Sequence, residues 1–273
     1  LSRFYLYKGI AYEFSNNQYQ KALTNYEICW KYAKETKHLK NETTALMRLN
    51  YMYYSLNDTA KSKFLAKYIK KILDTTKSTY TKAVLNGSLA EYYQNNSDYD
   101  TFINYQLRAI TFKKLLEKSK INEENIGISY SQIAGAYIKM KQYAKAIDYL
   151  DEAKPYIKNS PYVSAFLCNY YIQCYVGLGE FNNIKKYYTE IYTLPSVKDS
   201  LFLNLSLANK DMAQYYANTK QIGKAYIYAK KAVLFGQKSN DEEILMEANT
   251  IMGKVLYENQ DYKNAIKTLT TAS

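Results

Sequence analysis

The chain has 273 residues, of which 47% are hydrophobic, so it has the length and composition to form one long domain or two ordinary ones. A disordered chain is excluded, and the presence of only 9 glycines and 3 prolines argues against an all-β fold with frequent turns. The net charge of +12 allows an acidic partner, but the lysines are dispersed along predicted helices, as on an ordinary solvated surface.

A period of about 40 residues runs through the whole chain. Each repeat is marked by a small or apolar residue, here called the pivot, that follows a predicted polar turn. Successive pivots are 38 to 44 residues apart, and four of the seven are alanine. Such self-similarity is typical of stacked helical hairpins. The pivots are Ala22, Ser62, Phe102, Ala146, Ile184, Ala225 and Ala265.

Other positions keep a fixed distance from the pivot. Residues three before it and seven after it share its helical face, and tyrosine recurs nine before it. The residues three before the pivot are Tyr19, Thr59, Tyr99, Tyr143, Phe181, Ile222 and Tyr262. The residues seven after it are Cys29, Ile69, Ala109, Ala153, Ile191, Ala232 and Ala272. The residues nine before it are Tyr53, Tyr93, Tyr137, Tyr175, Tyr216 and Leu256, and Tyr12 joins them if the first repeat has one extra turn residue.

Each repeat is predicted to be two antiparallel helices around a short polar turn, because apolar residues recur at spacings of three and four in both halves. Small residues at Ala134, Ala213 and Gly253 and at the alanine pivots would let helix backbones approach closely. We therefore predict an all-α fold with at least 70% helix, in a single solenoid over residues 1–273. The predicted repeats cover residues 2–38, 43–77, 83–119, 127–159, 162–195, 200–239 and 241–273.

Local signals predict several helix ends. Ser160 and Pro161 are typical of an N-cap followed by the first helical residue, and Asn240 with Glu243 resembles a capping box. Pro155 is predicted to kink or end the second helix of the fourth repeat, and Pro195 to separate the fifth repeat from the sixth.

These patterns resemble the tetratricopeptide repeat family. The best matches are Ala134, Tyr137, Tyr143, Ala146 and Ala153 in the fourth repeat. The resemblance implies a right-handed superhelix with a concave groove for proteins or peptides, although the family's own period is 34 residues. Longer repeats of this kind resemble those of bacterial sensor kinases, transcription regulators and quorum-peptide receptors. The resemblance therefore implies a sensing or regulatory segment of a bacterial signalling protein.

The residues offer little for catalysis, and we predict no catalytic, cofactor-binding or metal-binding residue. The one histidine, His38, is expected at the surface, and Cys29, Cys168 and Cys174 are expected in packing positions. There is no Gly-rich phosphate loop and no metal-ligand spacing. The longest uncharged run, residues 159–179, contains too many polar residues for a membrane span. The compartment, bacterial cytoplasm or periplasm, stays open. The start at Leu1 suggests a segment of a longer protein.

Function is expected in the groove. In the family that this chain resembles, the first helix of each pair lines the concave face, and the polar residues on that face would contact an extended peptide. The packing tyrosines Tyr175 and Tyr216 should then point away. A solvated surface without function and a basic surface that binds nucleic acid are the alternatives. The candidate groove residues are Tyr51, Glu91, Ser131, Asn169, Gln173, Lys210, Gln214, Thr250 and Lys254.

Overall fold

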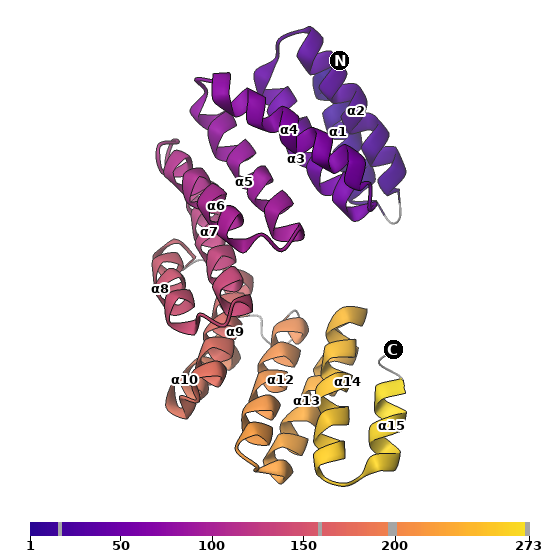
Figure 1. The fold of residues 1–273 in the computed structure, drawn as a ribbon, viewed down its shortest axis with the longest axis vertical. Helices are drawn as coiled ribbons and strands as arrows, with labels where there is room; N and C mark the ends of the chain where they lie inside the picture. The colour runs from indigo at the N-terminus through magenta and orange to yellow at the C-terminus, as the bar shows by residue number, and fades with distance from the viewer. Residues whose placement is uncertain (16–17, 158–159, 196–200, 271–273) are drawn as a thin grey trace. The chain divides into compact units, whose positions relative to one another are not determined.

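The computed structural model describes residues 1–15, 18–157, 160–195 and 201–270. The structure is 85% helical, and the described residues form fourteen α-helices, one short 3₁₀ helix and no strand. Successive helices pair as hairpins, which Figure 1 shows as adjacent coiled ribbons joined by short turns. The prediction of an all-α fold with at least 70% helix and fourteen main helices is confirmed.

The chain divides into two compact units. Unit 1 contains residues Leu1–Ser129 and unit 2 contains residues Tyr130–Ser273, so that the seventh helix crosses the boundary. The helices that begin in unit 1 are α1 (Ser2–Glu13), α2 (Tyr19–Glu35), α3 (Leu39–Ser55), α4 (Thr59–Thr75), α5 (Thr79–Asn95), α6 (Tyr99–Lys114) and α7 (Lys120–Lys139).

Unit 2 continues the pattern of hairpins. A 3₁₀ turn, η1, follows its first complete helix directly, and α9 to α15 form three further hairpins. The helices of this unit are α8 (Tyr143–Ala153), η1 (Lys154–Tyr156), α9 (Pro161–Leu178), α10 (Phe181–Thr193), α12 (Phe202–Asn218), α13 (Ile222–Ser239), α14 (Glu242–Glu258) and α15 (Tyr262–Thr270).

The turn inside each hairpin has one backbone conformation wherever it is described. The residue five before the pivot is left-handed, and the next N–H donates to the carbonyl of the residue nine before the pivot over 2.8–3.0 Å. In all seven hairpins the second helix begins three residues before the pivot. The backbone carbonyl of the recurring tyrosine therefore accepts the hydrogen bond that ends the first helix. The left-handed residues are Asn57, Ser97, Lys141, Gly179, Lys220 and Gln260.

The pivots form the contact between the two helices of each hairpin. All seven pivot side chains are buried, and so are the six described residues that lie seven positions after a pivot. Ala272 lies outside the described residues. Two glycines make room for side chains of the partner helix: a Cβ built on Gly253 would lie 2.5 Å from Leu269 Cγ, and one built on Gly9 would lie 2.6 Å from the buried Tyr26 ring.

The predicted helix ends are partly correct. The α8 helix ends at Ala153, directly before the 3₁₀ turn that contains Pro155, and α9 begins at Pro161. The N-cap of α14, however, is Asp241, whose carboxylate accepts from Ile244 N over 3.1 Å, while Asn240 ends α13 in the left-handed conformation. The prediction of Asn240 as the N-cap of α14 was wrong, because its left-handed backbone makes it the C-cap of α13.

Several tyrosines lie in the core, where carboxylates accept hydrogen bonds from their hydroxyl groups. Tyr26 is fully buried, and its hydroxyl donates to Glu13. Tyr171 is buried as well and donates to Asp151, while the Tyr68 hydroxyl donates to Glu42 over 3.1 Å. Burial and the neighbouring carboxylate raise the pKa of Tyr68 to about 12. These tyrosines therefore stay neutral and act as packing groups with one satisfied polar end.

Candidate functional site

A groove between α12 and α14 brings together four of the nine candidate residues. It belongs to unit 2, has a volume of about 380 Å³, and lies between the first helices of two successive hairpins. Four-residue spacing on each of the two helices directs these four candidates to one groove. The groove is lined by Lys210, Asp211, Gln214, Met246, Glu247, Thr250, Ile251 and Lys254.

One end of this α12–α14 groove is an ion-pair network. Lys210 Nζ lies 2.7 Å from Glu247 Oε2 and 3.7 Å from Asp211 Oδ1, so that one cation sits between two carboxylates. Although burial lowers it, the pKa of Lys210 is raised overall because Asp211 and Glu247 favour its charged form. Lys210 is therefore already neutralised by the protein and is not available to pair with a peptide carboxylate.

Asp211 is the buried member of the network. Its residue exposure is 8%, and its Oδ2 atom is buried without a hydrogen-bond partner of good geometry among the described residues. Burial raises the pKa of Asp211 to about 6; Lys210 and the Gln173 amide oppose the shift, and Glu247 adds to it. An acceptor atom left in this condition is costly, and it would be satisfied by an N–H donor that enters the groove.

The other end of the groove is open. Lys254 is exposed, and its Nζ donates to Gln214 Oε1 over 3.2 Å, while no described carboxylate lies within ion-pair distance of it. Gln214 also donates from Nε2 to Asn218 Oδ1 on the same helix. Lys254 is therefore the groove cation that can pair with an acidic group from outside. The side-chain amide of Gln214, which accepts a hydrogen bond from Lys254, is the neighbouring polar group in the groove.

The other candidates in unit 2 lie elsewhere or only beside the groove. Asn169 on α9 is fully buried, and its Nδ2 donates to Asn204 Oδ1 over 2.9 Å, so it joins α9 to α12. Gln173, one turn further along α9, lies close enough to Asp211 to affect its pKa. Ser131 on α7 is 9% exposed. The binding roles of these residues stay predictions.

The two candidates in unit 1 have different surroundings. Tyr51 on α3 is 49% exposed. Glu91 on α5 is half-buried, and burial raises its pKa while Lys113 and Arg48 oppose the shift. Glu91 is thus part of a charge cluster inside the helix packing of unit 1. Their binding roles also stay predictions.

The packing tyrosines face the second helices, as expected. Tyr175 stacks on Tyr187 of α10 with ring centroids 5.9 Å apart, and Tyr216 stacks on Tyr228 of α13 at 5.3 Å. Neither lines the α12–α14 groove. Sequence reasoning missed Asp211 and Glu247; the signal was present, since Glu247 precedes Thr250 by nearly one helical turn and Asp211 follows Lys210 directly.

The three cysteines and the histidine, which could in principle take part in chemistry, occupy positions in the helix packing and at a helix cap. The three cysteines are free and buried, and burial raises the pKa of Cys29 to about 11 and of Cys168 and Cys174 to about 12, which keeps the thiols protonated. His38 is exposed and caps α3, with Nδ1 accepting from Asn41 N. Across the described residues, no group of three potential metal ligands comes together.

A membrane-spanning helix is not found in the described part of the chain, since none of its helices combines the length and the apolar character that a span requires. The run 159–179, singled out by its lack of charge, contains α9, a helix that packs against α8, α10 and α12.

Comparisons by sequence find no family model and no curated protein that match. Solved structures do match. RapI in its apo form is similar with a TM-score of 0.68 at 13% identity, covering 98% of this chain and 75% of RapI. NprR in complex with its cognate peptide NprX gives a TM-score of 0.62 at 15% identity, covering 99% and 76%. The quorum sensor NprR from B. thuringiensis is similar in its apo form as well.

A third protein of similar structure is the C-terminal part of a TPR repeat-containing protein from Cytophaga hutchinsonii. Its TM-score is 0.57 at 18% identity, with 100% of this chain and 95% of that chain covered. At such identities the likeness concerns the fold alone. Together with the repeated hairpin, the fixed turn and the buried pivots, it shows that this chain has a tetratricopeptide-like helical repeat fold.

Proposed function

We propose that this chain is a non-catalytic module that binds an extended peptide in the α12–α14 groove, as the sensing or regulatory segment of a bacterial signalling protein. The observation that carries the proposal is the lining of the groove. Side chains from the first helices of two successive hairpins meet there, and they include one cation without a carboxylate partner among the described residues and one buried carboxylate, Asp211, whose Oδ2 atom has no hydrogen bond of good geometry.

The groove chemistry suits a peptide backbone with an acidic side chain. The buried Asp211 Oδ2 can accept from a backbone N–H, and the Gln214 amide can both donate and accept. Lys254 can pair with a peptide carboxylate, a charge-assisted bond that is stronger than a neutral one. Met246 and Ile251 give the apolar contact that a peptide side chain needs.

The similar structures support the proposal without deciding it. NprR is a quorum sensor and has been solved with its cognate peptide NprX. The likeness of this chain to NprR is one of fold, so a peptide ligand is an inference that has to be tested on this chain. The regulatory part of the proposal is tested by whether the gene that encodes this chain also encodes a kinase or DNA-binding domain.

The experiment is a binding screen with an array of synthetic linear heptapeptides in acidic, neutral and basic sets. We expect sequence-dependent binding that favours acidic peptides and weakens about tenfold in Lys254→Ala, because one charge-assisted hydrogen bond is lost. The matched control is Lys230→Ala, which removes the same charge from an exposed position on α13, outside the groove.

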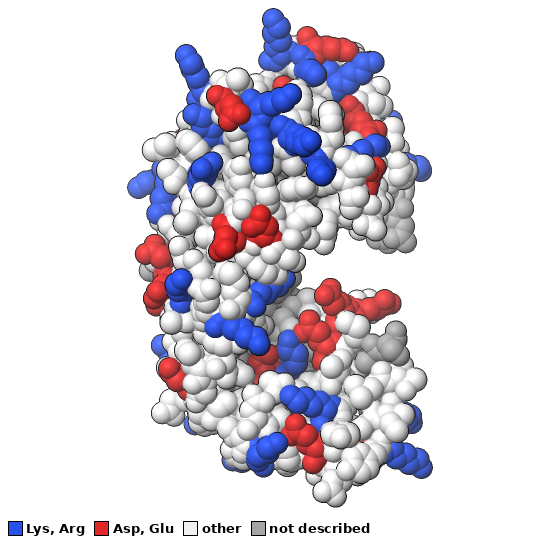
Figure 2. All heavy atoms as spheres, viewed as in Figure 1, with Lys and Arg blue, Asp and Glu red and all other residues white. Residues whose placement is uncertain are grey.

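Two results would argue against the proposal. Equal weakening by Lys254→Ala and Lys230→Ala would mean that the peptide responds to overall charge. Binding of single-stranded oligonucleotides that exceeds peptide binding and falls steeply with salt would favour the nucleic-acid alternative. Figure 2 shows basic and acidic side chains mixed over α12 to α14, which is the reason why we give preference to a peptide.

A further inference from the structure

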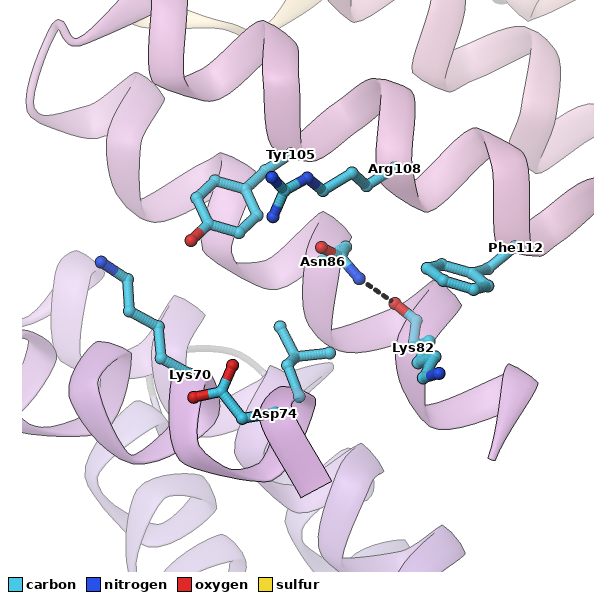
Figure 3. Close-up of a pocket in the computed structure, with 8 residues that line it drawn as sticks. Lys70, Asp74, Lys82, Asn86, Tyr105, Arg108 and Phe112 are labelled. Atoms are coloured by element: carbon cyan, nitrogen blue, oxygen red, sulfur yellow. Dashed lines mark hydrogen bonds between the residues drawn. The ribbon is translucent and has the colours of Figure 1, made fainter. Parts of the chain in front are cut away.

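A second pocket lies wholly inside unit 1, between α4, α5 and α6. Its volume is about 460 Å³, within the usual range for sites that hold small molecules. Figure 3 shows side chains entering from both sides, with Lys70 and Asp74 on α4 facing Tyr105, Arg108 and Phe112 on α6. Lys82 and Asn86 of α5 lie between them.

The pocket carries three cations and one carboxylate. Within the described residues, none of Lys70, Lys82, Arg108 and Asp74 takes part in a salt bridge. The pocket lining therefore carries two more positive than negative charges and no ion pair among the described residues, in contrast to Lys210 in the α12–α14 groove. An anion that entered would meet an uncompensated field, which low-dielectric walls strengthen.

Aromatic rings hold the cations in place. Arg108 lies over the Tyr105 ring at 5.4 Å and Lys82 over the Phe112 ring at 5.4 Å. Lys70 Nζ donates to the Tyr93 hydroxyl over 2.6 Å, a contact that raises the pKa of Lys70 and keeps it charged. Tyr93 stacks in turn on Tyr105 with ring centroids 5.4 Å apart. The cations are thus positioned before any ligand arrives.

The remaining walls restrict the ligand further. Leu73 and Phe112 offer apolar surface, and Asn86 is buried with its Nδ2 donating to the Lys82 carbonyl over 2.7 Å. The exposed carboxylate of Asp74 can only accept hydrogen bonds when ionised, so it favours a ligand with a hydroxyl group and repels a bare anion. A ligand must therefore combine an anionic end, a hydroxyl-bearing part and a compact body.

We propose that this pocket of unit 1 binds a small organic phosphate, with the phosphoryl group on Arg108 and a hydroxyl of the attached sugar on Asp74, while Lys70 and Lys82 lie toward the two ends of the pocket. The planar guanidinium of Arg108 matches two phosphate oxygens, and the two ammonium groups supply further charge. This site is independent of the peptide groove, because it uses other residues and lies in the other unit.

The test is calorimetric titration of the chain at low salt with ribose 5-phosphate, AMP, adenosine and inorganic phosphate. We expect saturable binding of both sugar phosphates and at least tenfold weaker binding of adenosine, which lacks the anion, and of inorganic phosphate, which lacks the hydroxyl-bearing ring. Arg108→Gln should weaken ribose 5-phosphate at least tenfold. The matched control is Arg3→Gln, since Arg3 also lies over a tyrosine of unit 1 but outside the pocket.

The variant Asp74→Asn tests the hydroxyl-bearing part of the ligand separately from the phosphoryl group. It should reduce the preference for ribose 5-phosphate over inorganic phosphate, because it removes the acceptor for the hydroxyl group and the charge that repels a bare anion. The proposal is overturned if no sugar phosphate binds saturably, if Arg3→Gln weakens binding as much as Arg108→Gln, or if wild-type protein holds inorganic phosphate as tightly as ribose 5-phosphate. Circular dichroism of each variant checks that the helices are intact.

Discussion

The two pockets of this chain differ in how the protein treats its own charges. In the α12–α14 groove, Lys210 is neutralised by Glu247 and Asp211, and one exposed lysine remains. In the pocket of unit 1, three cations have no ion-pair partner among the described residues. One repeat pattern therefore produces two kinds of surface, since the register fixes the helix packing while residues outside the register set the charge.

The two units also differ in net charge, and unit 1 is the more positive. Unit 1 has 20 basic and 12 acidic residues, and unit 2 has 17 and 13. Figure 2 shows blue side chains gathered over the upper part of unit 1, whereas red and blue are mixed in unit 2. The difference also reflects the helices involved, since the groove lies between two first helices and the unit 1 pocket mainly between the second helices α4 and α6.

The largest expected effect concerns the neutralised network of unit 2. The pKa of Asp211 is raised from 3.8 to about 6, so the folded protein prefers its protonated form, and this group gives more stability as pH falls from the folded pKa toward the unfolded one. Between pH 7.5 and 4.5, wild type should gain about 2 kcal/mol of unfolding free energy relative to Asp211→Asn. Urea unfolding of both proteins at both pH values measures this gain.

The variant Asp211→Asn is its own control, because every other titrating group is common to both proteins and cancels in the difference. A difference between the two proteins that does not change with pH would show that Asp211 is not desolvated by the packing of α12.

The next effect compares one pivot from each unit. Ala146 is fully buried at its helix contact, so Ala146→Phe should destabilise by about 1 to 3 kcal/mol through overpacking. Ser62 is the pivot of the second repeat and lines a pocket of about 350 Å³, so Ser62→Phe should cost less than about 1 kcal/mol because the ring has space to enter. Thermal unfolding of both variants gives the comparison.

The control for the pivot comparison is Lys145→Ala, beside Ala146 but exposed, with only a cation–π contact to Tyr137 at 5.5 Å. Its loss of stability should be small. Equal shifts in melting temperature for Ala146→Phe and Lys145→Ala would refute the register.

The smallest effect concerns the hairpin turns. Lys220 in unit 2 has φ 60°, a left-handed conformation that is unfavourable for a lysine, so Lys220→Gly should stabilise by about 0.5 to 1 kcal/mol. Asn57 occupies the same turn position in unit 1, and because asparagine tolerates this conformation, Asn57→Gly should change stability less. The denaturation midpoints of Lys220→Gly and Asn57→Gly measure the two gains in stability. An equal gain would contradict the claim that the left-handed backbone is more costly for lysine than for asparagine.

The fold was largely predictable from the sequence because hairpin packing repeats. Buried pivots and the recurring tyrosine follow from helix periodicity, which short-range patterns encode. The shared left-handed turn was not predicted, since glycine marks it only at Gly179 and the other five described turns use ordinary residues. The N-cap of α14 was assigned one residue too early for the same reason, because the conformation of Asn240 is invisible in its residue type.

The candidate site was predictable only in part. Register placed Lys210, Gln214, Thr250 and Lys254 on one groove, because four-residue spacing and stacked repeats determine which side chains share a face. It could not show that Lys210 is paired with Glu247 or that Asn169 is buried against Asn204, since both depend on contacts between hairpins. The unit 1 pocket was missed because its residues come from three helices without a common register.

The most direct test of the central claim is the dissociation constant of one acidic heptapeptide, selected from the array, for wild type, Lys254→Ala and Arg108→Gln. The account predicts about a tenfold rise for Lys254→Ala and no change for Arg108→Gln, since only the first removes a group from the α12–α14 groove. An unchanged constant in Lys254→Ala, or a larger rise in Arg108→Gln, would contradict the assignment of peptide binding to this groove.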